Sequence, residues 1–456
     1  MLCPPASVEA NDDIPEAYRH LMPIGDDFPG TVPAEAERVT KTVKFSLHPR
    51  DFSELKLLFP PKNQQSTGLY RVPGESITVE VHPLSETHKR PQLRIGAHTG
   101  RLVNAPKPLK RVSYASDLMN LDKPEQEDRN WASGLIYLES DQTGEEAFEV
   151  TIKGAVRAPW FKLGRDTPAQ WKTIRQYPAP WAELEGEHTI LTLPSAMIRD
   201  LVNPIPVINA YDQLVKDANA LAGLTPDAED IRHRAPDLPF RFVLDCQTNH
   251  GKQSYAGFNV VFYWLQYFDA RNTRFLRAKA TPYDFIDPET IRNGYLARHE
   301  LGHNYEPKDR VPLLGSGQGI AGVLLYAFRY RLGHRGIELK NGWSGDFYNY
   351  FGFPGQLYFF LLKGWTGAFK TEPSWKEGSF LMRLINEHSP EAITHFYKKY
   401  RTMESEFKGN DRFLIELSEA SGYNLAPLFS DWGIPFSPEA QQQVFGQYPC
   451  WHHDAF

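Results

Sequence analysis

The chain has 456 residues, of which 41% are hydrophobic and 23% are charged, and its formal net charge is −6. This length exceeds what one hydrophobic core usually serves, so we expect two or three domains of ordinary globular composition. The slightly negative charge gives no reason to expect nucleic acid or an anionic membrane as a partner.

The number of cysteines and the length of the apolar runs exclude further classes of protein and site. Cys3, Cys246 and Cys450 are too few and too scattered for a disulfide framework or a thiolate zinc site. No apolar run approaches the roughly 18 residues of a membrane span, so we expect no transmembrane segment. The N-terminus has neither a basic region nor an apolar run, so no signal peptide is visible and the compartment is undecided.

The first third of the chain has the sequence pattern of a β protein. Residues 1–40 are rich in Pro, Asp and Glu, and we expect an irregular extension there. From 41 to 158, apolar and polar residues alternate with period two in short segments separated by Gly, Pro and Asp turns. We therefore predict a β-sandwich domain at 41–158. Its clearest predicted strands are 76–81, 93–95, 135–138 and 148–152.

The rest of the chain changes from mixed to helical. Residues 159–290 contain predicted strands at 187–193 and 240–245 and a helix at 210–221, so we predict an α/β lobe. From 291 to 456 helical patterns dominate, and we predict a helical lobe. Its candidate helices are 319–330, 356–363, 380–387, 391–400 and 412–421.

One stretch, His299-Glu300-Leu301-Gly302-His303, carries a chemical pattern. Residues four apart lie on the same face of a helix, so His299 and His303 can direct their imidazoles at one metal ion. Glu300 follows the first histidine and can take a proton from a water on that metal. This HExxH spacing predicts a Zn²⁺ site with His299 and His303 as ligands and Glu300 as the catalytic base.

The surroundings of this stretch are compatible with a short helix. Thr290 or Asn293 can cap its start, and Pro307 would stop it soon after the second histidine. The alternative is a helix with two ordinary histidines. Gly302 weakens a helix and Arg298 brings a cation close to the proposed dication, and both favour that alternative slightly.

Further short motifs are spread from about residue 40 to 440. They are TGLY at 67–70 with PGE at 73–75, RIGAH at 94–98, YPAPWAEL at 177–184, HELGHN at 299–304, and NL at 424–425 with DWGIP at 431–435. In this order they resemble the enhancin-like zinc peptidase family, which includes viral enhancins and mucin-degrading bacterial gluzincins. The resemblance implies an α+β multidomain protein, a β-sandwich followed by a gluzincin-type peptidase domain with an α/β lobe and a helical lobe.

The resemblance also implies a function. Members use the two motif histidines as zinc ligands and the motif glutamate as general base on a zinc-bound water, which carries over onto His299, His303 and Glu300. It implies endopeptidase activity on glycoprotein or mucin-like substrates, cleaved beside O-glycosylated Ser or Thr, and it implies secretion. We expect a protein or glycoprotein substrate, no nucleic acid, and a monomer.

The third zinc ligand departs from the family pattern. Members place a glutamate after a short glycine-rich loop, whereas here Gln318 follows Gly315-Ser316-Gly317. A neutral amide oxygen is a poorer partner for Zn²⁺ than a carboxylate. Asp309, Glu306, Glu338 or a water are alternatives, although we expect each of these acids to be a solvated surface carboxylate. Glu306 would lie about 10 Å along the helix axis from His299, too far to converge easily.

Three functions therefore stay open. The first is a zinc metallopeptidase. The second is a catalytically degenerate peptidase fold that binds a protein or glycan without turnover, which the departure at Gln318 favours. The third is a membrane-associated regulator, as some relatives with altered motifs are, but no basic patch or lipidation motif supports it.

Overall fold

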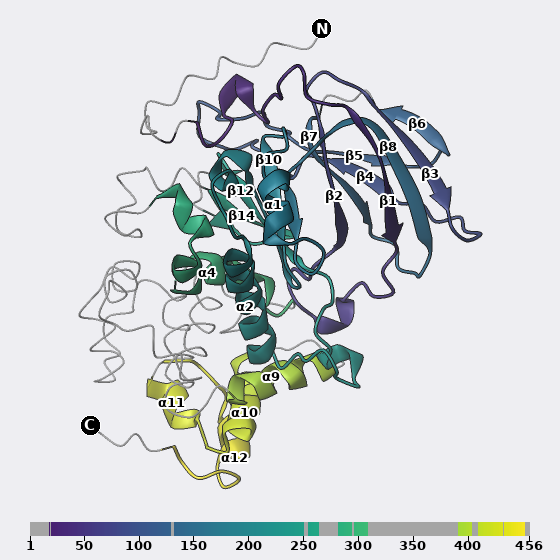
Figure 1. Cartoon of the computed structure of the whole chain (residues 1–456). Coiled ribbons are helices and arrows are strands. Elements are labelled where there is room, and N and C mark those ends of the chain that lie inside the picture. Colours follow the sequence, from purple (N-terminus) through teal and green to yellow (C-terminus); the bar gives the residue numbers. More distant parts are fainter. Residues whose placement is uncertain are drawn as a thin grey trace.

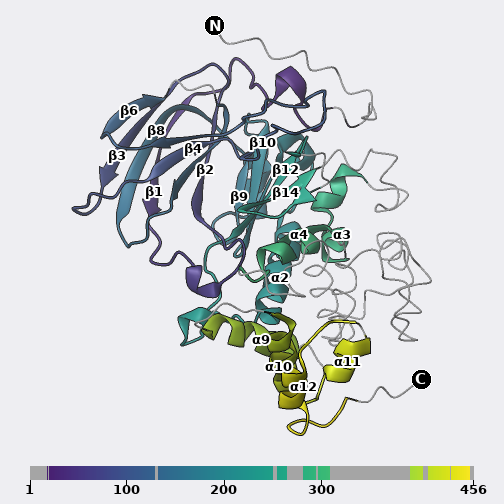
Figure 2. The same cartoon turned by 180° about the vertical axis from the view of Figure 1, so that it is seen from behind.

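The computed structural model describes residues 18, 20–128, 132–249, 254–263, 281–293, 296–308, 391–403, 409–431 and 433–451. A strand-rich N-terminal part lies beside a second, smaller sheet, and helices lie on the far side of that second sheet (Figure 1, Figure 2). Within these residues, no helix is both long enough and apolar enough to cross a membrane.

The N-terminal part is an eight-stranded sheet whose strands pair antiparallel. Its order is β5-β4-β7-β2-β8-β3-β6, and β1 also pairs with β8. The long strand β8 pairs with β1 on one edge and β3 on the other, and its last two residues pair with β2. The strands are β1 (Val39–Ser46), β2 (Asn63–Arg71), β3 (Ile77–Pro83), β4 (Gln92–Ile95), β5 (Asp117–Asn120), β6 (Glu125–Asp128), β7 (Gly134–Ser140) and β8 (Ala147–Arg157).

Burial alternates along these strands. In β3, Ile77, Val79 and Val81 are buried, while Thr78 and Glu80 are only partly so. Successive side chains of a strand point to opposite faces, so one face of β3 supplies the hydrophobic core of the N-terminal part. The strands predicted at 76–81, 93–95, 135–138 and 148–152 are confirmed as β3, β4, β7 and β8.

The second sheet has six strands in the order β13-β14-β12-β11-β10-β9. Strands β10, β11 and β12 are buried at every residue, because other elements cover both faces, and they therefore lack a clear alternation. The strands predicted at 187–193 and 240–245 are confirmed as β11 and β12. The six strands are β9 (Trp160–Lys162), β10 (Trp181–Glu185), β11 (Thr189–Pro194), β12 (Phe240–Asp245), β13 (Ser254–Tyr255) and β14 (Asn259–Tyr263).

Helices complete the second part. The predicted helix at 210–221 is the C-terminal portion of α2, and those at 391–400 and 412–421 are α9 and α10; the ones predicted at 319–330, 356–363 and 380–387 lie outside the described residues. Thr290, one of the two caps predicted for the helix of the HELGH motif, lies inside the preceding helix α3, where its N–H donates to Asp287 Oδ2 at 2.7 Å, so it does not cap α4. The helices are α1 (Pro168–Ile174), α2 (Ile205–Leu221), α3 (Pro288–Asn293), α4 (Leu296–Asn304), α9 (Glu391–Thr402), α10 (Gly409–Ser421), α11 (Ala426–Asp431) and α12 (Pro438–Val444).

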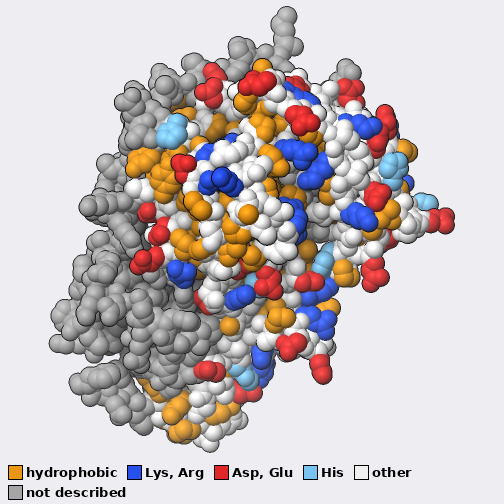
Figure 3. Space-filling model, viewed as in Figure 1, with side chains coloured by type: hydrophobic (Ala, Val, Ile, Leu, Met, Phe, Trp, Pro, Cys, Tyr) orange, Lys and Arg blue, Asp and Glu red, His pale blue; other side chains and the backbone are white. Residues whose placement is uncertain are grey.

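Specific contacts join the two parts. The buried Arg111 of the N-terminal part forms a two-pronged ion pair with Asp245 at the end of β12, with N–O distances of 2.8 Å. The Asn259 side chain of β14 donates to the Ala97 carbonyl at 2.9 Å. On the face shown in Figure 3, acidic and basic side chains of the described residues are interspersed.

The sequence therefore indicated the mixed content correctly, with strands first and helices concentrated later. The β-sandwich, the two-lobe description and the boundaries at 40, 158 and 290 stay predictions.

Candidate metal centre

Helix α4 (Leu296–Asn304) carries the two motif histidines and sits in the interior of the molecule. Leu301 on this helix is fully buried. The Tyr305 hydroxyl just beyond it donates to Asn219 Oδ1 of α2 at 2.8 Å. The helix stops before Pro307, as the sequence predicted. Packing on several sides therefore fixes the direction in which α4 presents its polar face.

The two histidines converge through the same ring nitrogen. His299 Nε2 and His303 Nε2 lie 3.1 Å apart, and the ring planes are inclined by 81°. Two zinc–nitrogen bonds of 2.0–2.1 Å at a tetrahedral angle would separate their nitrogens by roughly 3.3 Å. The observed spacing is thus within a few tenths of an ångström of that required by one shared zinc ion.

Glu300 joins the same group. His299, Glu300 and His303 each offer a ligand atom, and these atoms all lie within 4.8 Å of one another. His299 and Glu300 are buried and His303 is half-buried. Burial, followed by the neighbouring His303, holds the pKa of His299 well below its usual value. His299 is therefore neutral at pH 7, the form in which imidazole binds a metal.

Glu306 is the carboxylate that the sequence placed wrongly. It was expected to be a solvated surface carboxylate, but it is only 6% exposed. Its Oε1 lies 2.6 Å from His303 Nδ1, the ring nitrogen that faces away from His299. The physical reason is that α4 ends in a tight turn, in which the N–H groups of Tyr305 and Glu306 donate to carbonyls three residues back, so the Glu306 carboxylate meets the His303 ring.

Asn304 is a second residue whose role the sequence did not reveal. Its Oδ1 accepts the Gly257 backbone N–H at 3.1 Å, and its Nδ2 donates to the Gly257 carbonyl at 2.9 Å. The Asn304 side chain thus makes the two hydrogen bonds that a neighbouring strand would make, and it connects α4 to the turn between β13 and β14. The sequence signal was present in HELGHN, but nothing local indicated which backbone the amide binds.

The sequence offers Gln318, Asp309, Glu306 and Glu338 as side-chain candidates for the third ligand. Gln318, Asp309 and Glu338 lie outside the described residues. Within the described part of the chain, the group of histidine, cysteine and acidic side chains that could hold a metal consists of His299, Glu300 and His303. Glu306 faces His303 Nδ1, so it contacts a proposed ligand on the side away from the metal position.

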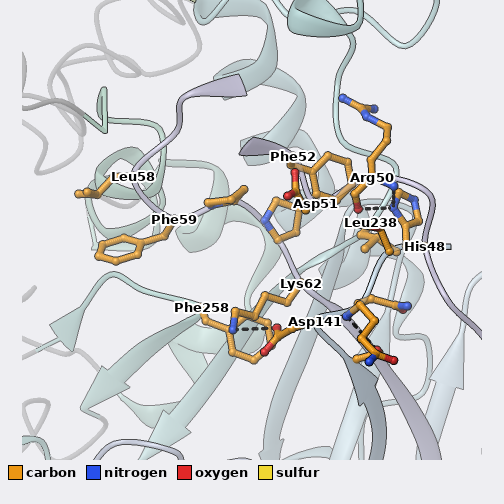
Figure 4. A pocket seen from close by; sticks show the side chains of 16 residues that line it. His48, Arg50, Asp51, Phe52, Leu58, Phe59, Lys62, Asp141, Leu238 and Phe258 are labelled. Carbon is orange, nitrogen blue, oxygen red and sulfur yellow. Dashed lines mark hydrogen bonds and ion pairs between the residues drawn. The ribbon is translucent and has the colours of Figure 1, made fainter. Parts of the chain in front are cut away.

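A cavity of about 250 Å³ lies beside the end of α4. Phe59 and Phe258 line it, and both adjoin Asn304, because Phe59 donates its N–H to the Asn304 carbonyl and Gly257 precedes Phe258. Figure 4 shows Lys62 and Asp141 beside Phe258; their N–O distance is 3.2 Å. The cavity is therefore a recess with two aromatic side chains and a paired polar rim, next to the C-terminal end of α4.

Comparison with protein families matches two consecutive models. The model for the N-terminal domain of M60-like peptidases matches residues 37–153. The model described as peptidase M60, enhancin and enhancin-like, matches residues 154–312, a range that includes all of α4.

The curated relatives that the chain matches are named as channel-associated factors and not as peptidases. The chain is 35% identical over 246 residues to TRPM8 channel-associated factor 1 of Bos taurus, covering 54% of this chain and 24% of the relative. It is 27% identical over 405 residues to a TRPM8 channel-associated factor homolog of Danio rerio, covering 85% of this chain and 40% of the relative. The chain thus spans less than half the length of these relatives.

Solved structures share the fold. A functionally unknown conserved protein from Bacillus anthracis superposes with a TM-score of 0.68 at 17% identity, covering 92% of this chain and 80% of that one. ZmpB metallopeptidase from Clostridium perfringens gives 0.64 at 14%, covering 90% and 81%. The M60 catalytic domain of ZmpC from the same organism, solved with the sialyl T antigen, gives 0.62 at 13%, covering 90% and 80%.

Proposed function

Because the chain belongs to the enhancin-like M60 peptidase family, we propose that it is a zinc-dependent endopeptidase acting on glycoprotein or mucin-like substrates. The observation that carries this proposal is the convergence of two imidazole nitrogens, 3.1 Å apart, beside the carboxylate of Glu300. The sialyl T antigen in the ZmpC structure supports a glycan-bearing substrate for this family.

His299 and His303 would hold the zinc ion, with the third ligand supplied by Gln318, Asp309, another acid or water. Both histidines present Nε2 toward the same point, and the remaining nitrogen of His303 is occupied by Glu306, so the donor set fits the metal. When bound, zinc would lower the pKa of a water molecule and polarise the carbonyl of the peptide bond to be cleaved.

Glu300 is the proposed general base. It is buried next to both imidazoles, within reach of the attacking water, and its carboxylate would accept a proton from that water. The same carboxyl group would then donate this proton to the leaving amine, so that the carboxylate is restored after each turnover. Burial of Glu300 excludes bulk water, which would otherwise compete for that proton.

A second candidate function is binding without cleavage. The TRPM8 channel-associated factors are named for an association and not for a reaction, and the third-ligand position here departs from the family pattern. The cavity beside Phe59 and Phe258 offers a recess that needs no metal to bind an apolar group. On this alternative the chain would bind a protein or glycan partner.

Zinc stoichiometry of the purified, dialysed protein separates the two functions. The peptidase function predicts about one zinc ion per chain, whereas the binding function predicts little zinc and weak uptake on titration. Hydrolysis of an O-glycosylated mucin-like protein and of casein would then be measured by mass spectrometry of the products.

Glu300→Gln tests the base directly. The amide keeps the shape of the side chain but cannot accept the proton, so turnover should fall by about 10² to 10⁴-fold while zinc content is unchanged. Glu289→Gln, the same change at an exposed position of α3, should leave turnover unaltered. Retained turnover in Glu300→Gln would remove Glu300 as the base.

A further inference from the structure

Glu306 is a buried carboxylate that contacts a proposed zinc ligand on the side opposite the metal position. Its Oε1 lies 2.6 Å from His303 Nδ1, while His303 Nε2 faces His299. A carboxylate in this position accepts the Nδ1 hydrogen, which leaves the lone pair on Nε2 and fixes the orientation of the ring. Glu306 therefore controls the two properties of His303 on which metal binding depends.

Glu306 is held from two directions: its N–H donates to the His303 carbonyl of α4 at 3.2 Å, and its carbonyl is bound by the N-terminal part. Residues 56–59 of the N-terminal part, here called the N-terminal latch, pair in a strand-like manner with the chain that follows α4. The Leu58 N–H donates to the Glu306 carbonyl at 2.8 Å, and the Lys308 N–H donates to the Lys56 carbonyl at 2.9 Å. Leu57 and Pro307 form the antiparallel bridge between these bonds. The carbonyl of Glu306 is thus held by a residue far away in the sequence, while its N–H is held by the local turn.

The latch is itself anchored. Leu57 is only 3% exposed and belongs to a hydrophobic core to which both parts contribute. Lys56 Nζ donates to the Met403 carbonyl at 2.7 Å, just beyond the end of α9. Phe52 and Lys56 have left-handed backbone conformations, with φ of 59° and 48°, on either side of the turn before the latch. Non-glycine residues adopt such conformations when the surrounding structure enforces them.

We propose that Glu306 is a positioning residue for His303, and that the N-terminal latch fixes Glu306 in place. This inference rests on the proposed zinc site. It makes the N-terminal part a component of the metal centre, because its backbone bonds determine where a carboxylate meets a ligand.

Substitution of Glu306 tests the first half of the proposal. Zinc affinity would be measured by competition with a chelator, and the environment of the ligands by the visible spectrum of the Co²⁺-loaded protein. Glu306→Ala should weaken zinc binding by about 10- to 100-fold, and Glu306→Gln should weaken it less, because its amide oxygen still accepts the Nδ1 hydrogen. Both variants should change the Co²⁺ spectrum. Glu289→Gln should change neither affinity nor spectrum.

Substitution in the latch tests the second half. Leu57→Ala removes the side chain that seats the latch, and Leu93→Ala removes an equally buried leucine from β4, far from α4 in the fold. Both should lower the thermal unfolding temperature, but only Leu57→Ala should also weaken zinc binding and alter the Co²⁺ spectrum. Equal zinc affinity in these two variants would overturn the role of the latch.

The outcomes separate this inference from the proposed function. If the wild-type chain takes up no zinc, the peptidase function fails and the inference fails with it. If the wild type binds zinc and the Glu306 variants bind it equally well with an unchanged spectrum, the peptidase function stands and only the positioning role is overturned.

Discussion

Two clusters of buried polar side chains, one between the two sheets and one on α4, are built differently. Between the sheets, the Arg241 guanidinium pairs with the Glu183 carboxylate, and the hydroxyls of Tyr137 and Thr192 donate to the same carboxylate at 3.1 and 3.0 Å. Arg241 also donates to the Ser66 hydroxyl at 3.2 Å. Opposite charges cancel here, and hydrogen bonds surround them.

The cluster on α4 combines like groups. It consists of two imidazoles, His299 and His303, whose Nε2 atoms meet, and two carboxylates, Glu300 and Glu306, beside them. Two imidazole nitrogens that meet at one point, with carboxylates beside them, form a set of donor atoms that suits a cation. Burial of polar groups alone therefore does not distinguish a structural cluster from a functional one. The two are distinguished by whether the charges are paired and by whether several possible metal-binding atoms face one point.

Arg241→Met should break the structural cluster and spare the other. It leaves Glu183 buried without its cation, and the free energy of unfolding should fall by about 3–5 kcal/mol. Zinc content should not change, because Arg241 makes no contact with α4 in the described structure. Urea unfolding and metal analysis on the same preparation measure both quantities.

The matched control for this variant is Arg38→Met. Arg38 pairs with Glu75 at the surface, with side chains 29% and 38% exposed, so the same substitution should change stability little. Loss of zinc from Arg241→Met in the folded state would contradict the separation of the two clusters.

Acid should destabilise the fold through buried neutral histidines in both regions. Burial lowers the pKa of His98 to about 4, and burial together with His303 lowers that of His299. Above pH 6.5 these histidines are neutral in both the folded and the unfolded chain. As the pH falls below 6.5, a histidine in the unfolded chain takes up a proton that the buried histidine does not, so the free energy of unfolding decreases. For His98 the loss between pH 6.5 and 4 is about 3 kcal/mol. Urea midpoints at pH 7 and 5 measure the slope.

A neutral replacement isolates the part due to His98. Its Nε2 donates to the Leu244 carbonyl at 3.0 Å, and the amide of a glutamine can donate to the same oxygen without titrating. His98→Gln should therefore show a shallower pH dependence than the wild type. The same slope in both proteins would mean that His98 is not the group responsible.

The local sequence pattern was sufficient to predict those elements whose pattern extends over only a few residues. The period-two alternation of Ile77, Val79 and Val81 predicted β3, and the four-residue spacing of His299 and His303 predicted their shared face. Both depend only on the geometry of one element, which is why they could be read from the sequence.

The remaining features depend on contacts between distant segments. Glu306 was expected to be a solvated carboxylate, whereas it is buried against His303, and Leu58 of the N-terminal part binds its carbonyl. The pairing of Asn304 with Gly257 likewise has no local signature. Strands such as β12, buried on both faces, also lose the alternation that marks a half-buried strand.

Gln318→Glu should sharpen the metal cluster. Gln318 lies outside the described residues, so its place as third ligand stays a sequence prediction. A carboxylate brings a negative charge that an amide lacks, and if position 318 faces the metal, zinc affinity should rise about tenfold, or about 1.4 kcal/mol. Chelator competition on Gln318→Glu and Asp309→Asn distinguishes the candidates. If Asp309 is the ligand, Asp309→Asn weakens binding and Gln318→Glu leaves it unchanged. If water completes the site, neither substitution changes the affinity, and His299 and His303 are then the protein ligands on which binding depends.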